Sequence, residues 1–239
     1  MNKCVIIEPR RNKGEPELPA AGIIAANPSD VPRLRKLAAE HSLKQHFLFH
    51  SGLYSSDHFF LAGPAVGAPM AVMCLEKLIA LGAKDIILYG WCGSLVPALK
   101  ALDILVPTWA LSEEGTSVHY EAGDRPQPDP ELRHRLAAHC RRSGLTCSAG
   151  PVWTTDAPYR ETRAKVQQYG AEGIVAVDME YSALCTVAAY RGVRLAACML
   201  VSDELWRPRW QPQYSRPEFR ARSGAVLRSL CSWLKGQFE

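Results

Sequence analysis

The sequence predicts an α/β fold: a single-domain, three-layer α/β/α sandwich built around a mixed, mainly parallel central sheet. The first observation behind this prediction is a series of short apolar runs, typical of strands that are buried on both faces. The second is that stretches with helical periodicity separate these runs, as they do when helices connect parallel strands. The third is that no segment has the length of an interdomain linker and no internal repeat is present.

The chain opens with a polar segment that contains several prolines, so we expect 1–20 to form an N-terminal arm ahead of one domain at 21–239. The first apolar run, AGIIAA, indicates a buried strand, and Pro28 can open the helix that follows it. The expected strands lie at 21–26, 47–54, 58–62, 85–89, 104–111, 146–155, 174–177 and 194–202. The expected helices lie at 28–37, 69–81, 131–142, 162–169, 178–190 and 216–234. Glycine follows several of these helices, as is common at helix C-termini.

Composition places the chain among ordinary globular proteins. Of its 239 residues, 47% are hydrophobic and 22% are charged, which excludes disordered and collagen-like chains. No apolar run approaches the ~20 residues that span a bilayer, and the N-terminus lacks the apolar core of a signal peptide. We therefore expect a cytoplasmic protein with no membrane partner. The eight cysteines stand singly, mostly within apolar runs, which is typical of small buried side chains.

The net charge gives little indication of a charged partner. Lysine and arginine total 28 against 24 acidic residues, for a net charge of +4, and arginines between 207 and 228 form the main basic cluster. We expect these arginines to lie on a solvated helix face, and we expect no nucleic-acid partner. The seven histidines show no metal-binding spacing. We therefore expect neither a metal nor any other cofactor.

Four short segments follow the expected strands and are candidates for a ligand site. Ligands of parallel α/β sheets bind beyond the carboxyl ends of the strands. The segments at 27–30, 90–93, 178–180 and 202–204 lie at such ends, and three of them carry acidic side chains.

These segments, in this order and spacing, resemble the nucleoside phosphorylase family, which comprises purine nucleoside and uridine phosphorylases and the adenosylhomocysteine-type nucleosidases. The most specific part is Val177-Asp178-Met179-Glu180 at the start of a helix, followed by Val201-Ser202-Asp203 after the next strand. The segment Gly90-Trp91-Cys92-Gly93 and the LDILV run at 102–106 also match. The resemblance covers roughly 21–234 and implies the fold predicted above.

The resemblance implies roles for several acidic residues. Cleavage of an N-glycosidic bond builds positive charge on the ribose and negative charge on the base, so the protein has to hold the sugar and stabilise the base. Glu180 would accept hydrogen bonds from the ribose hydroxyls, with Met179 lying against the sugar. Asp203 would be the catalytic acid beside a purine-type base, because uridine-specific members generally lack an acid there. Asp178 is typical of an acid that stabilises a helix N-terminus.

Four further residues are candidates for substrate binding through the same resemblance. Tyr159 falls where the family often has an aromatic side chain over the base. Gly93 closes the strand-end motif, and Val66 lies in a glycine-bearing loop that approaches the sugar, where glycine permits close contact. Arg216 lies at about the distance from Asp203 at which some relatives place an arginine that assists this acid.

The expected phosphate site departs from the family pattern. Phosphorylases of this family carry a glycine-aspartate-proline-x-arginine turn after the first strand, and here the arginine position holds Asp30. A second phosphate arginine is replaced by Leu88, and the hydroxyl residue after the strand-end glycine is replaced by Trp91. A third arginine, lent by a neighbouring subunit, aligns near Gln45. A carboxylate in place of an arginine would repel a phosphate dianion.

Two explanations of this departure remain open. In the nucleosidase branch the position of Asp30 carries a glutamate that activates water, so Asp30 would be a catalytic general base and the reaction would be a hydrolysis. Alternatively, phosphate binds through other cations, such as Lys44, Arg10 or Arg11. Asp30 alone also fits a plain acid in the first turn of a helix.

The sequence therefore predicts an enzyme that cleaves the N-glycosidic bond of a nucleoside with a purine-type base, yielding the free base and ribose or ribose 1-phosphate. A nucleosidase that uses Asp30 and a nucleoside-binding protein without catalysis are the alternatives. The expected partners are a nucleoside and phosphate. The resemblance also implies a homo-oligomer, from a dimer to a hexamer.

Overall fold

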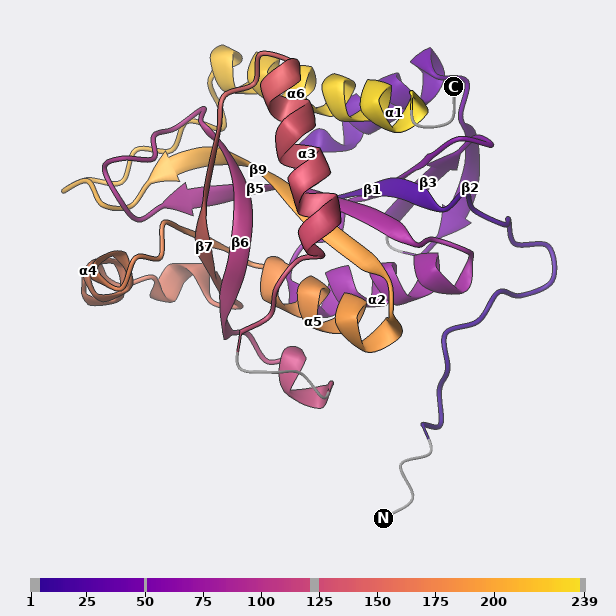
Figure 1. Ribbon diagram of the computed structural model, residues 1–239, viewed down its shortest axis with the longest axis horizontal. Helices are drawn as coiled ribbons and strands as arrows, with labels where there is room; N and C mark the ends of the chain where they lie inside the picture. Colours follow the sequence, from indigo (N-terminus) through magenta and orange to yellow (C-terminus); the bar gives the residue numbers. More distant parts are fainter. Residues whose placement is uncertain (1–4, 50, 121–124, 237–239) are drawn as a thin grey trace.

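Two helical layers cover opposite faces of one nine-stranded sheet in this computed structural model, which describes residues 5–49, 51–120 and 125–236 (Figure 1). The three-layer mixed architecture predicted from the sequence is confirmed. Within the described residues the strands are β1 (Ala21–Ala25), β2 (Lys44–Leu48), β3 (Ser51–Ser55), β4 (Phe60–Gly63), β5 (Asp85–Ser94), β6 (Ile104–Glu113), β7 (Cys147–Thr155), β8 (Ala176–Asp178) and β9 (Arg194–Glu204).

The sheet curls back on itself at one end. Its strands follow the order β2-β3-β4-β1-β5-β8-β7-β6-β9, and β9 also pairs with β5. The last five strands of this order therefore form a closed ring, which the sequence did not predict. Strand β5 runs parallel to β1 and β9, whereas the short β8 runs antiparallel to β5. This closure brings the carboxyl ends of β5, β8 and β9 to one place.

The helices of the described residues are α1 (Val31–Glu40), α2 (Ala68–Ala80), α3 (Pro130–Arg142), α4 (Arg163–Ala171), α5 (Tyr181–Arg191) and α6 (Pro217–Lys235). Figure 1 shows α2 and α5 on one face of the sheet, and α1, α3 and α6 on the other. Each layer encloses its own apolar cluster against the strands. A third, smaller cluster packs α4 against β7 and β8, beside the closed ring.

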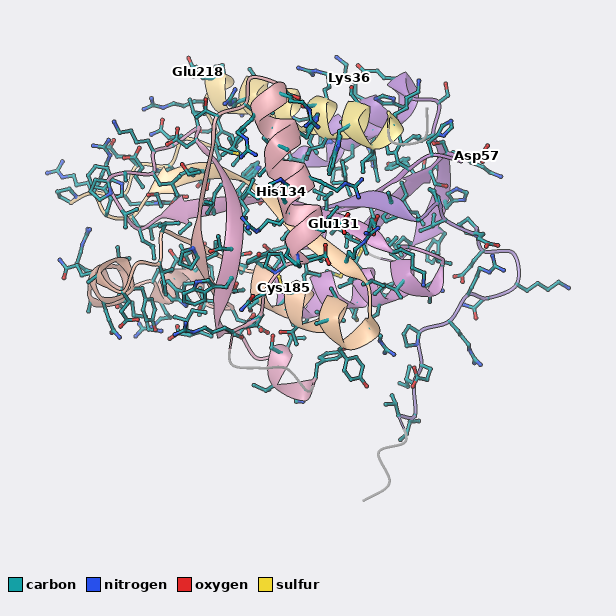
Figure 2. All side chains as sticks on the ribbon, in the orientation of Figure 1. Lys36, Asp57, Glu131, His134, Cys185 and Glu218 are labelled. Carbon is teal, nitrogen blue, oxygen red and sulfur yellow. The ribbon has the colours of Figure 1, made fainter. Side chains whose placement is uncertain are left out.

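Helix α3 shows how the sequence pattern fixes the packing of a helix. Leu132, Leu136 and Cys140 recur at helical spacing and are buried, so this side of the helix faces the sheet. Figure 2 shows Glu131 and His134 on the outer side of the same helix. The side chain of Asp129 accepts a hydrogen bond from the Leu132 N–H at 2.7 Å and caps the helix N-terminus.

The structure differs from the sequence-based expectation in the first hairpin. The expected strand 47–54 is instead parts of two antiparallel strands, β2 and β3, in which Lys44 pairs with Ser55 and Leu48 with Ser51. Strand β2 lies at the edge of the sheet, and its Phe47 is 84% exposed. An edge strand has no second neighbour to bury it, so it lacks the apolar run that marks a central strand.

The ends of two central strands and one helix also differ from the expectation. Strands β5 and β9 extend to Ser94 and Glu204, and their last residues still pair with each other. The glycines at 90 and 93, which we interpreted as the end of a strand, therefore lie inside one. Helix α5 begins at Tyr181 rather than at Asp178, because Asp178 is the last residue of β8.

The expected N-terminal arm contains no helix or strand over the described residues 5–20. Its last part is anchored to the domain: Leu18 is buried, and its N–H donates to the carbonyl of Leu81 at 2.8 Å. Among the described helices, none is long and apolar enough to cross a bilayer.

Candidate active site

A cavity of about 580 Å³ opens where the carboxyl ends of β5, β8 and β9 meet. The register of the strands explains why residues distant in the sequence line it together. Gly93 on β5 pairs with Val177 on β8 and with Asp203 on β9. The register of β5 against β9 shifts after Cys92, so that Ser202 is an extra residue and the strand bulges at this point.

Five of the residues predicted for substrate binding line this cavity: Met179, Glu180, Tyr159, Gly93 and Val66. Asp203, predicted as a catalytic acid, lines it as well. Asp30 and Arg216 do not line it. The structure thus brings together six of the eight residues that the sequence singled out.

Glu180 is held beside the loop that precedes α2. Its Oε1 accepts a hydrogen bond from the backbone N–H of Gly67 at 2.7 Å. Gly67 has φ +79, a left-handed conformation that favours glycine, and it stands just before the first turn of α2. Val66, which precedes it, is 43% exposed. The Glu180 carboxyl therefore lies where the glycine-bearing loop at 63–67 meets the start of α5.

Asp178 makes contacts that organise the turn between β8 and α5. Its Oδ1 accepts a hydrogen bond from Thr154 Oγ1 at 2.6 Å. Its Oδ2 accepts from the backbone N–H groups of Glu180 and Tyr181, at 3.1 and 2.7 Å. These bonds satisfy free amides at the start of α5. Asp178 thus positions Glu180 through the backbone.

Burial raises the pKa of both carboxyl groups. Burial, together with the nearby charge of Asp178, raises the pKa of Glu180 to about 8. It raises the pKa of Asp178 to about 6, against the opposing hydrogen bonds from Thr154 and the two amides. The bond from Gly67 favours the ionised form of Glu180 but does not offset the burial. Ligand hydroxyls that donate to Glu180 would therefore favour its ionised form.

The raised pKa of Glu180 predicts that the stability of the ligand-free protein falls with rising pH. A carboxyl whose pKa changes from 4.5 when unfolded to about 8 when folded holds its proton longer in the folded chain. Its stabilising contribution is therefore complete below about pH 4.5 and is lost as the pH rises to 8. Glu180→Gln removes this titration, so thermal unfolding of the variant should depend less on pH across that window. The same pH dependence in both proteins would contradict the raised pKa.

Asp203 lies next to the last residue of β9, and its carboxyl accepts hydrogen bonds from two donors. Trp210 Nε1 donates to its Oδ2 at 2.7 Å, and Ser202 Oγ donates to its Oδ1 at 2.6 Å. Gly93 lies opposite, and a Cβ there would come within 2.2 Å of Leu205 Cδ1 and 3.4 Å of Asp203 Oδ2. Glycine at this position therefore leaves the room that the Leu205 side chain occupies, with the Asp203 carboxyl beside it.

Glu161, which sequence reasoning did not single out, also lines the cavity. It directly follows the short 3-10 turn Pro158–Arg160, and its N–H donates to the carbonyl of Pro158. Burial and, to a smaller extent, the charge of Asp203 raise the pKa of Glu161 to about 7. Tyr159, within the same turn, is 99% exposed. It stands at the rim of the cavity in this ligand-free structure.

A loop after β9 closes one side of the cavity and is tied down by a cation. Arg163 donates to three backbone carbonyls, those of Leu205, Arg207 and Pro208, at 2.7 to 3.1 Å. Further along this loop, Trp210 reaches back to Asp203. An indole and a guanidinium thus hold the loop against the cavity.

Aromatic side chains occupy the region that the resemblance assigned to phosphate. Trp91 stacks on Tyr214 with 6.1 Å between ring centroids, and its edge meets Phe219 at 4.9 Å. Trp91 and Tyr214 line the cavity, whereas Leu88 is fully buried in the sheet. Among the described residues that line the cavity, Arg163 is the one cation. Its guanidinium is engaged by the carbonyls of the loop.

Asp30 lies beneath this region rather than in the cavity. It is 0% exposed, and its Oδ1 accepts from Arg33 Nη1 at 2.7 Å and from Ser223 Oγ at 2.8 Å. Ser223 in turn accepts from the hydroxyl of Tyr89. Burial raises the pKa of Asp30, and its two donors oppose the rise. A general base has to reach the water that it activates, and this placement does not offer Asp30 to the cavity.

Arg216 and Gln45 do not line this cavity either. Arg216 precedes α6 and its N–H bonds to the carbonyl of Gln213. Gln45 lies on the edge strand β2, beside a separate cavity between the first hairpin and α1.

The described part of the chain holds no group of three or more acidic, histidine or cysteine side chains arranged to bind a metal.

Glu161 and Trp210 were not predicted from the sequence, because the role of each depends on tertiary contacts. Glu161 is an isolated acid two residues after Tyr159, and Trp210 stands among arginines and prolines in an irregular loop. The one sequence signal for Trp210 is the concentration of tryptophan and tyrosine between 206 and 214. Such a concentration indicates an aromatic surface but gives no partner for it.

The comparisons with known proteins agree with this geometry. The sequence pattern of the phosphorylase superfamily matches residues 20–232. The chain belongs to this superfamily. The membership of the nucleoside phosphorylase family that the strand-end motifs predicted is thereby confirmed, and so is the prediction of an enzyme of that family.

Two curated relatives in the phosphorylase superfamily carry nucleoside names. The chain is 26% identical to a guanosine phosphorylase of Halorubrum lacusprofundi over 187 residues, which cover 77% of this chain and 78% of the relative. It is 28% identical to a DeoD-type purine nucleoside phosphorylase of Bacillus thuringiensis over 159 residues, which cover 65% and 68% of the two chains.

Two solved structures of the superfamily share the fold. The purine nucleoside phosphorylase of Toxoplasma gondii, in complex with immucillin-H, aligns with a TM-score of 0.77 at 19% identity, covering 92% of this chain and 93% of that one. The P. knowlesi homologue of the P. falciparum enzyme aligns with a TM-score of 0.76 at 20% identity, covering 97% of both chains.

Proposed function

We propose that this protein cleaves the N-glycosidic bond of purine nucleosides and transfers the ribosyl group to inorganic phosphate. One observation supports the proposal most: a single cavity at the strand ends is lined both by Glu180, with its glycine loop, and by the acidic pair of Glu161 and Asp203. The names of the relatives, a guanosine phosphorylase and a purine nucleoside phosphorylase, point to the same substrate class.

In this proposal Glu180 binds the sugar. The 2′- and 3′-hydroxyls of ribose donate to its two carboxylate oxygens, in place of the N–H of Gly67 that occupies Oε1 in the ligand-free protein. Met179, beside it in the cavity, contacts the sugar with an apolar surface. Carboxylate charge close to the ribose also favours the positive charge that develops there as the bond breaks.

The acidic pair binds the base. A purine accumulates electron density on its five-membered ring as it leaves, and a protonated or donor group beside that ring lowers the barrier. Tyr159 at the rim offers an aromatic face against which the planar base can stack. A pyrimidine lacks the second ring, so the acidic pair favours a purine.

A second candidate acceptor is water, and one observation favours it. The cavity has Trp91 and Tyr214 in the region assigned to phosphate, and the one cation among its described lining residues is engaged by backbone carbonyls. Asp30, buried beneath, is in contact with Arg33 and Ser223. The hydrolytic version therefore needs a water-activating group other than Asp30 in its present position.

Product analysis separates these versions. Purified protein is incubated with inosine, guanosine and adenosine, with and without phosphate, and the base and sugar products are quantified. We expect base release that requires phosphate and yields ribose 1-phosphate. Release of free ribose without phosphate would support the hydrolytic candidate. Nucleoside binding without base release in either buffer would support the non-catalytic alternative and contradict an enzyme.

We propose further that the protein works in the cytoplasm as a homo-oligomer, between a dimer and a hexamer. Two features support assembly: the edge strand β2 exposes Phe47, and the described lining of the cavity holds a single cation, Arg163, so further cations would come from a neighbouring subunit. Light scattering of the purified protein gives its mass, and a monomer at working concentration would contradict this part of the proposal.

A further inference from the structure

Two carboxyl groups from different parts of the chain line the same region of the cavity. Glu161 follows the 3-10 turn after β7, and Asp203 lies near the end of β9. The charge of Asp203 acts on the carboxyl of Glu161. Two neighbouring carboxylates in a partly dry cavity are costly to ionise together, so such a pair tends to keep one proton.

The hydrogen bonds of the pair indicate which group keeps the proton. Asp203 accepts one bond on each oxygen, from Trp210 Nε1 and from Ser202 Oγ. Donors of this kind stabilise a carboxylate. No donor among the described residues bonds to the carboxyl of Glu161. Burial and the charge of Asp203 therefore both favour its protonated form. The proton therefore resides on Glu161.

The other charged groups around Glu161 do not reverse this assignment. Arg163, two residues further on, directs its guanidinium to the carbonyls of the loop after β9. Asp178 and Glu180 line the same cavity from β8 and α5 and add no positive charge. Burial and Asp203 raise the pKa of Glu161 to about 7.

We propose that Glu161 is the catalytic general acid for the leaving base, and that the neighbouring Asp203 carboxyl, held by its two donors, favours the protonated form of Glu161. This inference rests on the proposed function and deepens it, because the sequence had assigned the acid's role to Asp203. As the bond between C1′ of the ribose and N9 of the purine breaks, its electron pair moves into the base. The Glu161 proton passes to N7, an oxygen of the acceptor bonds to C1′, and Glu161 regains a proton from solvent.

A purine methylated at N7 provides the test, because its ring already carries the positive charge that protonation would supply. Wild type and Glu161→Gln are compared with inosine and with 7-methylinosine at about pH 6, below the pKa of about 7. We expect Glu161→Gln to lower kcat for inosine by about a hundredfold or more. With 7-methylinosine, kcat should change by less than about threefold. Glu172→Gln, at an exposed site at the C-terminal end of α4, is the matched control and should resemble wild type with both substrates.

The outcomes separate this inference from the function on which it rests. If wild type releases no base from either nucleoside, the proposed function fails. If wild type is active and Glu161→Gln keeps its rate with inosine, Glu161 is not the acid. An equal loss with both substrates assigns Glu161 to binding or to packing and also overturns the proposal.

Asp203→Asn tests the supporting role of Asp203. Removing its charge removes the repulsion that disfavours the ionised form of Glu161, so the pKa of Glu161 should fall. The fall of kcat for inosine on the alkaline side should therefore occur at lower pH in Asp203→Asn than in wild type. If this fall of kcat occurs at the same pH or at a higher pH in Asp203→Asn, Asp203 does not favour the protonated form of Glu161.

Discussion

Glu180→Gln is expected to lower kcat/KM for a purine ribonucleoside by about 30- to 1,000-fold. Hydrogen bonds to a charged acceptor contribute about 1.5–3 kcal/mol each, and an amide offers one acceptor oxygen in place of two. Weakening one bond and losing the charge of the second oxygen removes about 2–4 kcal/mol, which converts to that range of rates. The amide oxygen can still accept the N–H of Gly67, so the loop before α2 should stay in place.

The substrate gives this experiment its control. Wild type and Glu180→Gln are compared with inosine and with 2′,3′-dideoxyinosine, which has neither hydroxyl. If Glu180 acts on the ribose hydroxyls, the variant should lose much more activity with inosine than with 2′,3′-dideoxyinosine, because the dideoxy substrate has already lost both bonds. An equal loss with both substrates would mean that Glu180 acts on folding or on the base.

Arg33→Met is expected to lower the free energy of unfolding by about 3 kcal/mol near neutral pH. Arg33 Nη1 lies 2.7 Å from Asp30 Oδ1, and the Asp30 side chain is fully buried. Removing the cation leaves a buried carboxylate that still accepts a hydrogen bond from Ser223 but has lost its opposite charge, and burying such an unpaired charge costs free energy. The loss should become smaller as the pH falls, because burial already raises the pKa of Asp30 and the group can take up a proton.

Two further variants show whether the loss belongs to the ion pair. Arg35→Met, at an exposed position of the same helix, should change stability by less than about 0.5 kcal/mol. Arg33→Met combined with Asp30→Asn should be less destabilised than Arg33→Met alone, because both charges are gone. The folded double variant should also keep its kcat, since Asp30 does not line the cavity. Loss of kcat there would return Asp30 to a catalytic role.

Two acidic residues of the site could be predicted because they follow strands that the sequence marks clearly. The motifs at 177–180 and 201–203 follow buried apolar runs, and the carboxyl ends of such strands meet at one edge of a sheet. This was enough to place Glu180 and Asp203 together. The pairing of Gly93 with both β8 and β9, by contrast, depends on a closed ring of strands and on a bulge after Cys92. Neither leaves a periodic signal in one sequence.

Asp30, Glu161 and Trp210 show why the rest could not be predicted. Asp30 was placed by its position after the first strand, but Arg33 and Ser223 turn its carboxyl away from the cavity, and Ser223 lies on the last helix. Glu161 and Trp210 become important through Asp203, which is more than forty residues from the first and reaches the second across an irregular loop. Contacts of this kind are decided by packing, and local patterns do not encode them.

The central claim is that one cavity holds the sugar at Glu180 and the base at the pair of Glu161 and Asp203. A crystal structure with a purine C-nucleoside, whose carbon–carbon glycosidic bond resists cleavage, tests it most directly. The account predicts the ribose hydroxyls within hydrogen-bond distance of Glu180 and the five-membered ring of the base beside Glu161. A nucleoside bound with its ribose at Asp203, or bound outside this cavity, would contradict the account.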